Sequence, residues 1–325
     1  MTSFRFSDAL LWSALLIPFA APQALAQAYP NKPIRLVLPY APGGATDFIG
    51  RTLAQHLGDT IGQTVIAENR TGSGGIPGTD YVARAAPDGY TIVMMDPAIA
   101  INPTLLPSLP FDTFKDLQVV SRVNSAPLVL VASPTLPVKT YDEFVAYAKA
   151  NPGKLNFSSA GIGTSPHLAS ELFIQRAGIS AVHVPYRGIG QSYTDMMSGK
   201  ISFAFSSFAG ALPFTADNRV RPLAVSSLKR GAIYADVPTV DEAGMKGFEV
   251  DLWYVILAPA AVPADTVGKL NAALVKALAL PEVKAAFAKI GAEPVSSTPQ
   301  AGTAFLKSEY EKWRKVILDA NLQQK

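Results

Sequence analysis

The sequence predicts an α/β protein built from two mostly parallel β-sheets, each flanked by helices. Short strand-like segments alternate with amphipathic helical segments along most of the chain, an order typical of parallel sheets covered on both faces. The strand segments are almost entirely apolar, as buried parallel strands are. The chain has 325 residues, more than one hydrophobic core usually organises, so two lobes are expected.

The elements follow one another in a regular order. The first strand, 34–38, is almost entirely apolar, and residues 46–57 follow with apolar side chains at helical spacing. Further strands are expected at 64–67, 91–95, 128–132, 155–158, 181–184, 201–205, 223–226 and 252–258, and further helices at 76–86, 141–150 and 166–177. The final segment, 263–321, reads as almost entirely helical, with stops near Pro281 and Pro299.

Residues 1–28 have the pattern of an export signal. A positively charged start precedes a short apolar run, 9–20, and Ala24-Leu25-Ala26 fits the small-x-small cleavage rule. The cut is expected after Ala26, with a cut after Ala28 left open. The run is too short and too interrupted by proline to be a typical membrane span, and the absence of cysteine closes the lipoprotein route. We therefore expect a soluble protein in the periplasm.

Composition excludes several classes of chemistry. The formal net charge of +3 is too small for a nucleic-acid footprint. Without cysteine there are no disulfides, thiolate nucleophiles or cysteine-ligated metals. His56, His167 and His183 are scattered without ligand spacing, and neither a phosphate loop nor a nucleophile elbow is present. We expect no metal, no cofactor and no catalytic residues, although catalytic groups that meet from distant sequence remain an alternative.

Two glycine-rich loops are the candidate ligand site. Ligands of open α/β sheets bind beyond the carboxyl ends of strands, and residues 40–47 (YAPGGATD) and 158–165 (SSAGIGTS) each lie between a strand and a helix. Glycine lets the backbone approach a ligand, and free amides at a helix N-terminus bind anions without Arg or Lys. A plain capped strand–turn–helix connection is the structural alternative. Two such loops facing each other predict a small anion held between lobes.

The motifs of these loops resemble the Bug family, the TctC-type extracytoplasmic substrate-binding proteins of tripartite tricarboxylate transporters. In chain order the motifs are Pro39-Tyr40-x-Pro42-Gly43-Gly44-x-Thr46-Asp47, Glu68-Asn69-Arg70-x-Gly72, Pro87-Asp88-Gly89-Tyr90-Thr91, Gly161-x-Gly163-Thr164 with His167, and His183-Val184-Pro185-Tyr186-Arg187-Gly188. The resemblance implies a type II periplasmic-binding-protein-like fold, with two lobes joined by crossing hinge strands. It also implies a monomer that passes a small carboxylate to membrane subunits. We expect lobe 1 at 27–125 and 246–325, and lobe 2 at 126–245.

The resemblance also supplies ten of the expected site residues, and Ser159, Tyr186, Ser206 and Ser207 are added from this sequence. The expected ligand-binding residues are Tyr40, Pro42, Gly43, Gly44, Thr46, Asp47, Ser159, Gly161, Gly163, Thr164, His167, Tyr186, Ser206 and Ser207. Many relatives have an acidic residue where this chain has Ser206 and Ser207, which supply no charge to pair with a ligand amine. A dicarboxylate or an aromatic acid is therefore expected in preference to an amino acid. Phe208, Trp253 and Tyr254 are either an aromatic wall of the site or, as we expect for Trp253, core packing.

The same fold and site would also serve a ligand-sensing receptor for signalling, an ABC-type binding protein or, as a further alternative, an exported hydrolase. Sequence alone does not separate them.

Overall fold

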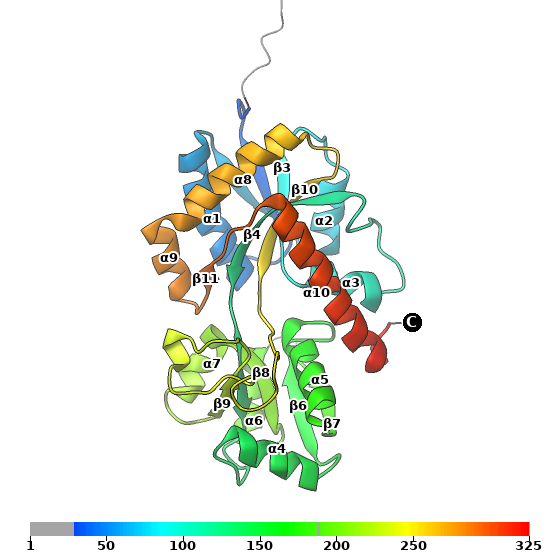
Figure 1. Ribbon diagram of the computed structural model, residues 1–325, viewed down its shortest axis with the longest axis vertical. Helices are drawn as coiled ribbons and strands as arrows, with labels where there is room; N and C mark the ends of the chain where they lie inside the picture. Colours follow the sequence, from blue (N-terminus) through cyan, green and yellow to red (C-terminus); the bar gives the residue numbers. More distant parts are fainter. Residues whose placement is uncertain (1–28, 187–188, 325) are drawn as a thin grey trace, which may run out of the picture.

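The apolar segments of the sequence assemble into two separate β-sheets, which lie one above the other in Figure 1. The computed structural model describes residues 29–186 and 189–324, and the expected export signal lies outside them. The first sheet has the order β11-β4-β10-β3-β1-β2 and the second β7-β6-β8-β5-β9. The strands are β1 (Ile34–Leu38), β2 (Val65–Asn69), β3 (Thr91–Met95), β4 (Leu117–Ser125), β5 (Leu128–Ala132), β6 (Leu155–Ser159), β7 (Ala181–Pro185), β8 (Phe203–Ser207), β9 (Arg221–Val225), β10 (Tyr254–Pro259) and β11 (Glu293–Pro294).

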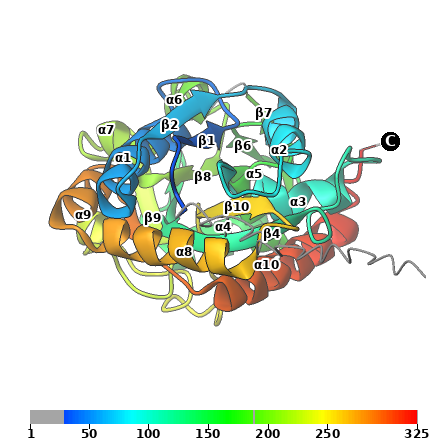
Figure 2. The ribbon, with the colours of Figure 1, turned by 90° about the horizontal axis from the view of Figure 1, so that it is seen from above.

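Helices cover the faces of both sheets because strand side chains alternate between the faces. In β1, Ile34, Leu36 and Leu38 pack with α1 and α8 in one apolar cluster, whereas Val37 packs on the opposite face in another. Figure 2 shows α8 and α10 along the same side of the molecule. The helices are α1 (Ala45–Ile61), α2 (Ile76–Ala83), α3 (Ala98–Leu105), α4 (Tyr141–Ala150), α5 (Ser165–Ala177), α6 (Ile189–Met197), α7 (Phe208–Thr215), α8 (Ala264–Ala279), α9 (Pro281–Ala288) and α10 (Pro299–Asp319), with short 3₁₀ turns η1 (Ser73–Gly75) and η2 (Ala232–Tyr234).

The chain crosses between the sheets twice, and the two crossings lie side by side (Figure 1). Only Ala126 and Pro127 separate β4 of the first sheet from β5 of the second. The return segment pairs with this crossing, because the amide of Leu252 donates to the carbonyl of Ala126 over 2.8 Å. Helix α10 packs against both α3 and α5, so it also links the two halves.

Most strands of each sheet run in one direction, as the sequence predicts, and the crossings add antiparallel pairs. Parallel pairing holds for β2, β1 and β3 and for β7, β6 and β8. Strand β10 is antiparallel to β3 and β4, and β5 is antiparallel to β8 and β9. The reason is topological: most strands end at the edge that faces the other sheet, whereas a strand arriving from the other sheet begins there. Short β11 adds another antiparallel pair with β4.

Strand β4, the longest strand, was not predicted from the sequence. It carries polar side chains that are typical of a loop, and several of these bond to partners far away in sequence. The side-chain amide of Gln118 donates to the backbone carbonyls of Pro259, Ala260 and Val262. Asn124 donates to the carbonyl of Leu252 and accepts the amide of Tyr254. These two polar residues therefore fasten β4 to β10 and its flanking residues instead of interrupting the strand.

Candidate ligand-binding site

A cavity of about 370 Å³ lies between the two sheets. Its walls come from the segment after β3, from the loop between β6 and α5, and from single residues of other segments. The lining residues are Tyr40, Gly74, Asp96, Ala98, Ile101, Asn102, Leu105, Ala160, Ile162, Gly163, Thr164, Ser165, Pro166, Ile189, Ser207 and Leu252. Among the described residues, then, the wall contains no Arg or Lys, and Asp96 is its one carboxylate.

The first predicted loop, residues 40–47, is stabilised by hydrogen bonds to the side chain of its own Asp47. Gly43 has a φ of 88°, which favours glycine, and its amide donates to Oδ2 of Asp47 over 3.1 Å. The other oxygen of Asp47, Oδ1, accepts from Nε of Arg51 and from the side-chain amide of Asn69, both over 2.9 Å. These hydrogen bonds lower the pKa of Asp47 to about 2, so it is ionised at neutral pH. The structure places Asp47, Pro42, Gly43 and Gly44 outside the cavity wall, with Asp47 supporting the loop.

Tyrosine hydroxyls connect the same loop to neighbouring strands. The hydroxyl of Tyr40 donates to Oδ1 of Asp96 over 2.7 Å, and Thr46 donates to the hydroxyl of Tyr254 over 3.0 Å. Tyr40 lines the cavity, whereas Thr46 is buried behind it. Asp96 was not among the predicted site residues. Burial raises its pKa, against the hydrogen bonds from Tyr40 and from the amide of Ala98.

The second loop, between β6 and α5, is also braced from within. Gly161 and Gly163 have φ values of 129° and 77°. The amide of Gly161 donates to Ser159, the hydroxyl of Thr164 donates to the carbonyl of Gly161 over 2.7 Å, and the amide of Gly163 donates to Nδ1 of His167 over 3.1 Å. Gly163, Thr164 and Ser165 line the cavity. Ser165 opens α5, and the first amides of a helix have no carbonyl partner within it.

His167 lies behind this loop, stacked on His183. Their ring centroids are 4.0 Å apart, and Nε2 of His183 lies 2.7 Å from the hydroxyl of Ser159. Burial, together with the neighbouring His167, lowers the pKa of His183 to about 4, so this ring is uncharged at neutral pH. Nε2 of His167 is buried without a hydrogen-bond partner in the described part of the chain and lies 3.5 Å from Glu171. Because Nδ1 accepts from Gly163, the ring hydrogen is on Nε2.

The remaining predicted residues have separate positions. The hydroxyl of Tyr186 donates to Asp195, and burial and this carboxylate raise its pKa to about 12. Ser206 is fully buried and accepts from Tyr193, outside the cavity wall, whereas Ser207 lines the cavity and caps α7. Trp253 and Phe208 are core residues, and the indole of Trp253 donates to buried Glu309. Of the predicted set, Tyr40, Gly163, Thr164 and Ser207 meet in the cavity wall.

Comparison with known proteins identifies the family. The model of the tripartite tricarboxylate transporter family receptor, TctC, matches residues 49–322. The chain belongs to this family. BugT of Bordetella pertussis is 35% identical over 308 residues, which is 94% of each chain.

Solved structures agree with this membership. The periplasmic binding protein BugD is 31% identical, with a TM-score of 0.76 over 91% of this chain and 100% of BugD. Rpa4515 of R. palustris, solved with adipate, is 30% identical, with a TM-score of 0.78 over 90% of this chain and 98% of Rpa4515. The chain is thus a TctC-type solute-binding protein with the two-sheet fold of its family, as the sequence motifs predict.

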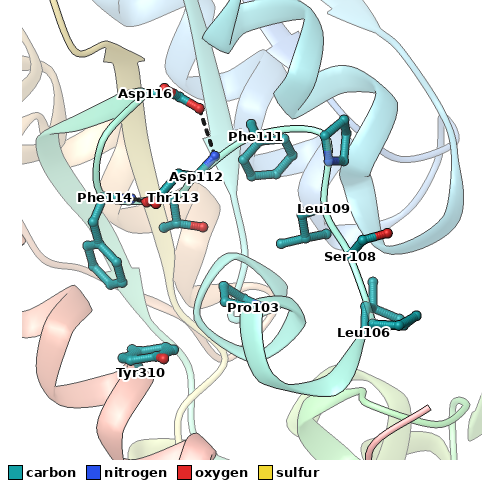
Figure 3. A pocket seen from close by; sticks show the side chains of 12 residues that line it. Pro103, Leu106, Ser108, Leu109, Phe111, Asp112, Thr113, Phe114, Asp116 and Tyr310 are labelled. Carbon is teal, nitrogen blue, oxygen red and sulfur yellow. Dashed lines mark hydrogen bonds between the residues drawn. The ribbon is translucent and has the colours of Figure 1, made fainter. Parts of the chain in front are cut away.

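A larger hollow of about 580 Å³ lies beside the loop that joins α3 to β4 (Figure 3). It contains none of the motif residues of the family resemblance. Its two carboxylates are engaged by the loop itself: Asp116 accepts the amide of Asp112, and Asp112 accepts the amides of Phe114 and Lys115. The cavity between the sheets is therefore the stronger candidate for the ligand site of this TctC-family chain.

Proposed function

We propose that this protein is exported to the periplasm, binds a small carboxylate between its two lobes and delivers it to the membrane subunits of a tripartite tricarboxylate transporter. The observation that carries the proposal is the cavity between the sheets, walled on one side by the α5 loop and on the other by Tyr40 and the segment after β3. No helix in the described residues is long and apolar enough to span a membrane. Catalysis is not part of the proposal.

The two loops offer different surroundings to an anion. Each holds a glycine amide with the side chain four residues later, Asp47 in the first loop and His167 in the second. Asp47 is an anion in the first turn of α1, whereas the first turn of α5 carries no acidic residue and contributes Ser165 to the cavity wall. We infer that the ligand carboxylate lies at the N-terminus of α5, where backbone amides and the helix dipole favour negative charge.

Closure of the lobes would strengthen this binding. Gly163, in the loop between β6 and α5, already lies against Leu105 of α3, since a Cβ on Gly163 would come within 2.2 Å of Leu105 Cδ2. A ligand that touches both walls stabilises the closed form in proportion to its preference for that form. Exclusion of water then strengthens the attraction between amide dipoles and carboxylate. We propose that lobe 1 comprises 27–125 and 246–325, that lobe 2 comprises 126–245, and that the monomer bends at the crossings.

Dicarboxylates such as the adipate found in Rpa4515, and aromatic acids, are candidates. The prediction that the ligand is not an amino acid depended on Ser206 and Ser207, which stand where many relatives have an acidic residue. Asp96 supplies a carboxylate to the same cavity, so that argument no longer excludes a ligand amine.

A thermal-shift panel tests the proposal. Mature protein is heated with mono- and dicarboxylates, aromatic acids, amino acids and, as controls, the corresponding amides and sugars. A ligand that binds only the folded protein raises the melting temperature by mass action. We expect stabilisation by at least one carboxylate and none by its amide. Stabilisation by uncharged compounds alone, or by nothing in the panel, would reject carboxylate binding.

A further inference from the structure

Asp96 lines the cavity and is held there by two hydrogen bonds. These bonds do not explain what Asp96 does for a ligand. It follows β3, and Oδ1 accepts both the hydroxyl of Tyr40 over 2.7 Å and the amide of Ala98 over 3.0 Å. The carboxyl group is thus held in one orientation and still contributes to the wall. Family membership and the sequence motifs give it no role.

The charge of the cavity wall makes Asp96 decisive for which carboxylates can bind. Among the described lining residues there is no cation to neutralise Asp96. The hydrogen bonds from Tyr40 and Ala98 favour the ionised form of Asp96 against the effect of burial. In a site with an effective dielectric constant of about 20, a second carboxylate 4 Å from the ionised group would lower affinity by up to about a thousandfold. A hydroxyl or ammonium in the same place would instead donate a charge-assisted hydrogen bond, which is among the stronger kinds.

We propose that Asp96 determines specificity by accepting a hydrogen bond from the ligand, which is a carboxylate that carries a hydroxyl or ammonium group away from its carboxyl end. This rests on the proposed function, with the ligand carboxylate at the N-terminus of α5 and the donor group directed to Asp96. The ligand then has one orientation, because the backbone amides of α5 bind its carboxylate and Asp96 accepts from the hydroxyl or ammonium group at its other end. Tyr40, which donates to Asp96 from the first loop, is a positioning residue.

Matched probes on two carbon skeletons test the inference by calorimetry. One series is butyrate, 4-hydroxybutyrate, 4-aminobutyrate and succinate; the other is benzoate, 4-hydroxybenzoate, 4-(aminomethyl)benzoate and terephthalate. In each series only the distal group changes. We expect wild-type protein to bind a hydroxyl or ammonium probe at least tenfold more tightly than the parent acid and the diacid of that series.

Variants assign the preference to Asp96. Asp96→Asn keeps an Oδ1 acceptor for Tyr40 and Ala98 but removes the charge, so we expect at least tenfold weaker binding of the preferred probe and unchanged or tighter binding of the diacid. Asp217→Asn removes a charge from an exposed aspartate paired with Arg219 and is the matched control, with wild-type affinities expected.

The outcomes separate the two proposals. If wild-type protein binds carboxylates that lack a donor at least as well, or if Asp96→Asn leaves the preference intact, the inference is overturned and carboxylate binding stands. If no carboxylate binds in either the probe series or the thermal-shift panel, the proposed function fails and the inference fails with it.

Discussion

A single methyl group at Gly163 should interfere with ligand binding. The Cβ of Gly163→Ala would lie 2.2 Å from Cδ2 of Leu105, about 1.2 Å short of the 3.4 Å at which ordinary contact begins. Leu105 is only 3% exposed and itself lines the cavity. Relief therefore requires that the Leu105 side chain change its conformation or that the two walls move apart. Both changes alter the wall of the ligand cavity.

The magnitude follows from two separate penalties. Gly163 has a φ of 77°, and placing alanine in the left-handed region costs about 1–2 kcal/mol of folding free energy. That cost falls on open and closed forms alike, so it does not alter affinity. The clash acts on the closed form, and we expect a loss of affinity of at least tenfold, which corresponds to about 1.4 kcal/mol.

Gly178→Ala is the matched control for Gly163→Ala. Gly178 ends the same helix, α5, with a φ of 63°, but a Cβ there would meet nothing within 4 Å. Both variants should lose similar stability in urea titrations, and only Gly163→Ala should lose affinity in calorimetry with a carboxylate from the panel. Adding Leu105→Ala to Gly163→Ala should restore part of the affinity, because it removes the atoms that clash. Equal affinities for the two glycine variants would refute the reasoning.

Three further predictions concern the residues around the loops. Asp47→Asn should lower the unfolding free energy by about 1–2 kcal/mol at pH 7; because the folded-state pKa is depressed to about 2, the difference from wild type in urea titrations should shrink as pH falls from 4 toward 2. A difference that stayed constant with pH would contradict this. An NMR titration should give His183 a pKa near 4, and since this is below the unfolded value, its share of stability should be complete above about pH 6.5 and lost toward pH 4. A pKa near 6.5 would mean that the ring is not buried as described. Ser207→Ala should lower stability by about 1 kcal/mol, as the loss of a helix cap does, because Ser207 accepts the amide of Gly210 at the start of α7; unchanged thermal and urea midpoints would show that the cap contributes nothing.

Local pattern was enough to predict the strands that lie inside one sheet. The strands at 34–38, 91–95 and 128–132 and the helix at 141–150 have the predicted bounds, since their apolar spacing reports burial directly. Strand β4 was harder to predict because its hydrogen-bond partners are far away in sequence. Gln118 and Asn124 look like loop residues until the return strand β10 is placed beside them.

Asp96 shows a second limit of reading motifs. The first loop attracts attention through its glycines, whereas Asp96 is a lone acid before Pro97 with no motif around it. The register of the sheet supplies what the motif lacks: Val37 of β1 pairs with Val93 of β3, so three residues further Tyr40 comes level with Asp96. Strand order, which one sequence does not give, would have revealed this pair.

The two glycine-rich loops share one construction and differ in its charge. In each, a glycine with positive φ donates its amide to the side chain four residues later, over 3.1 Å in both cases. The acceptor is an ionised carboxylate in the first loop and a histidine ring in the second. An internal anion occupies the place beside α1 that a ligand anion would take, while the histidine leaves the start of α5 without negative charge. Similar glycine motifs thus do not imply similar ligand contacts: the side chain that braces each loop decides which end of the cavity can hold a carboxylate.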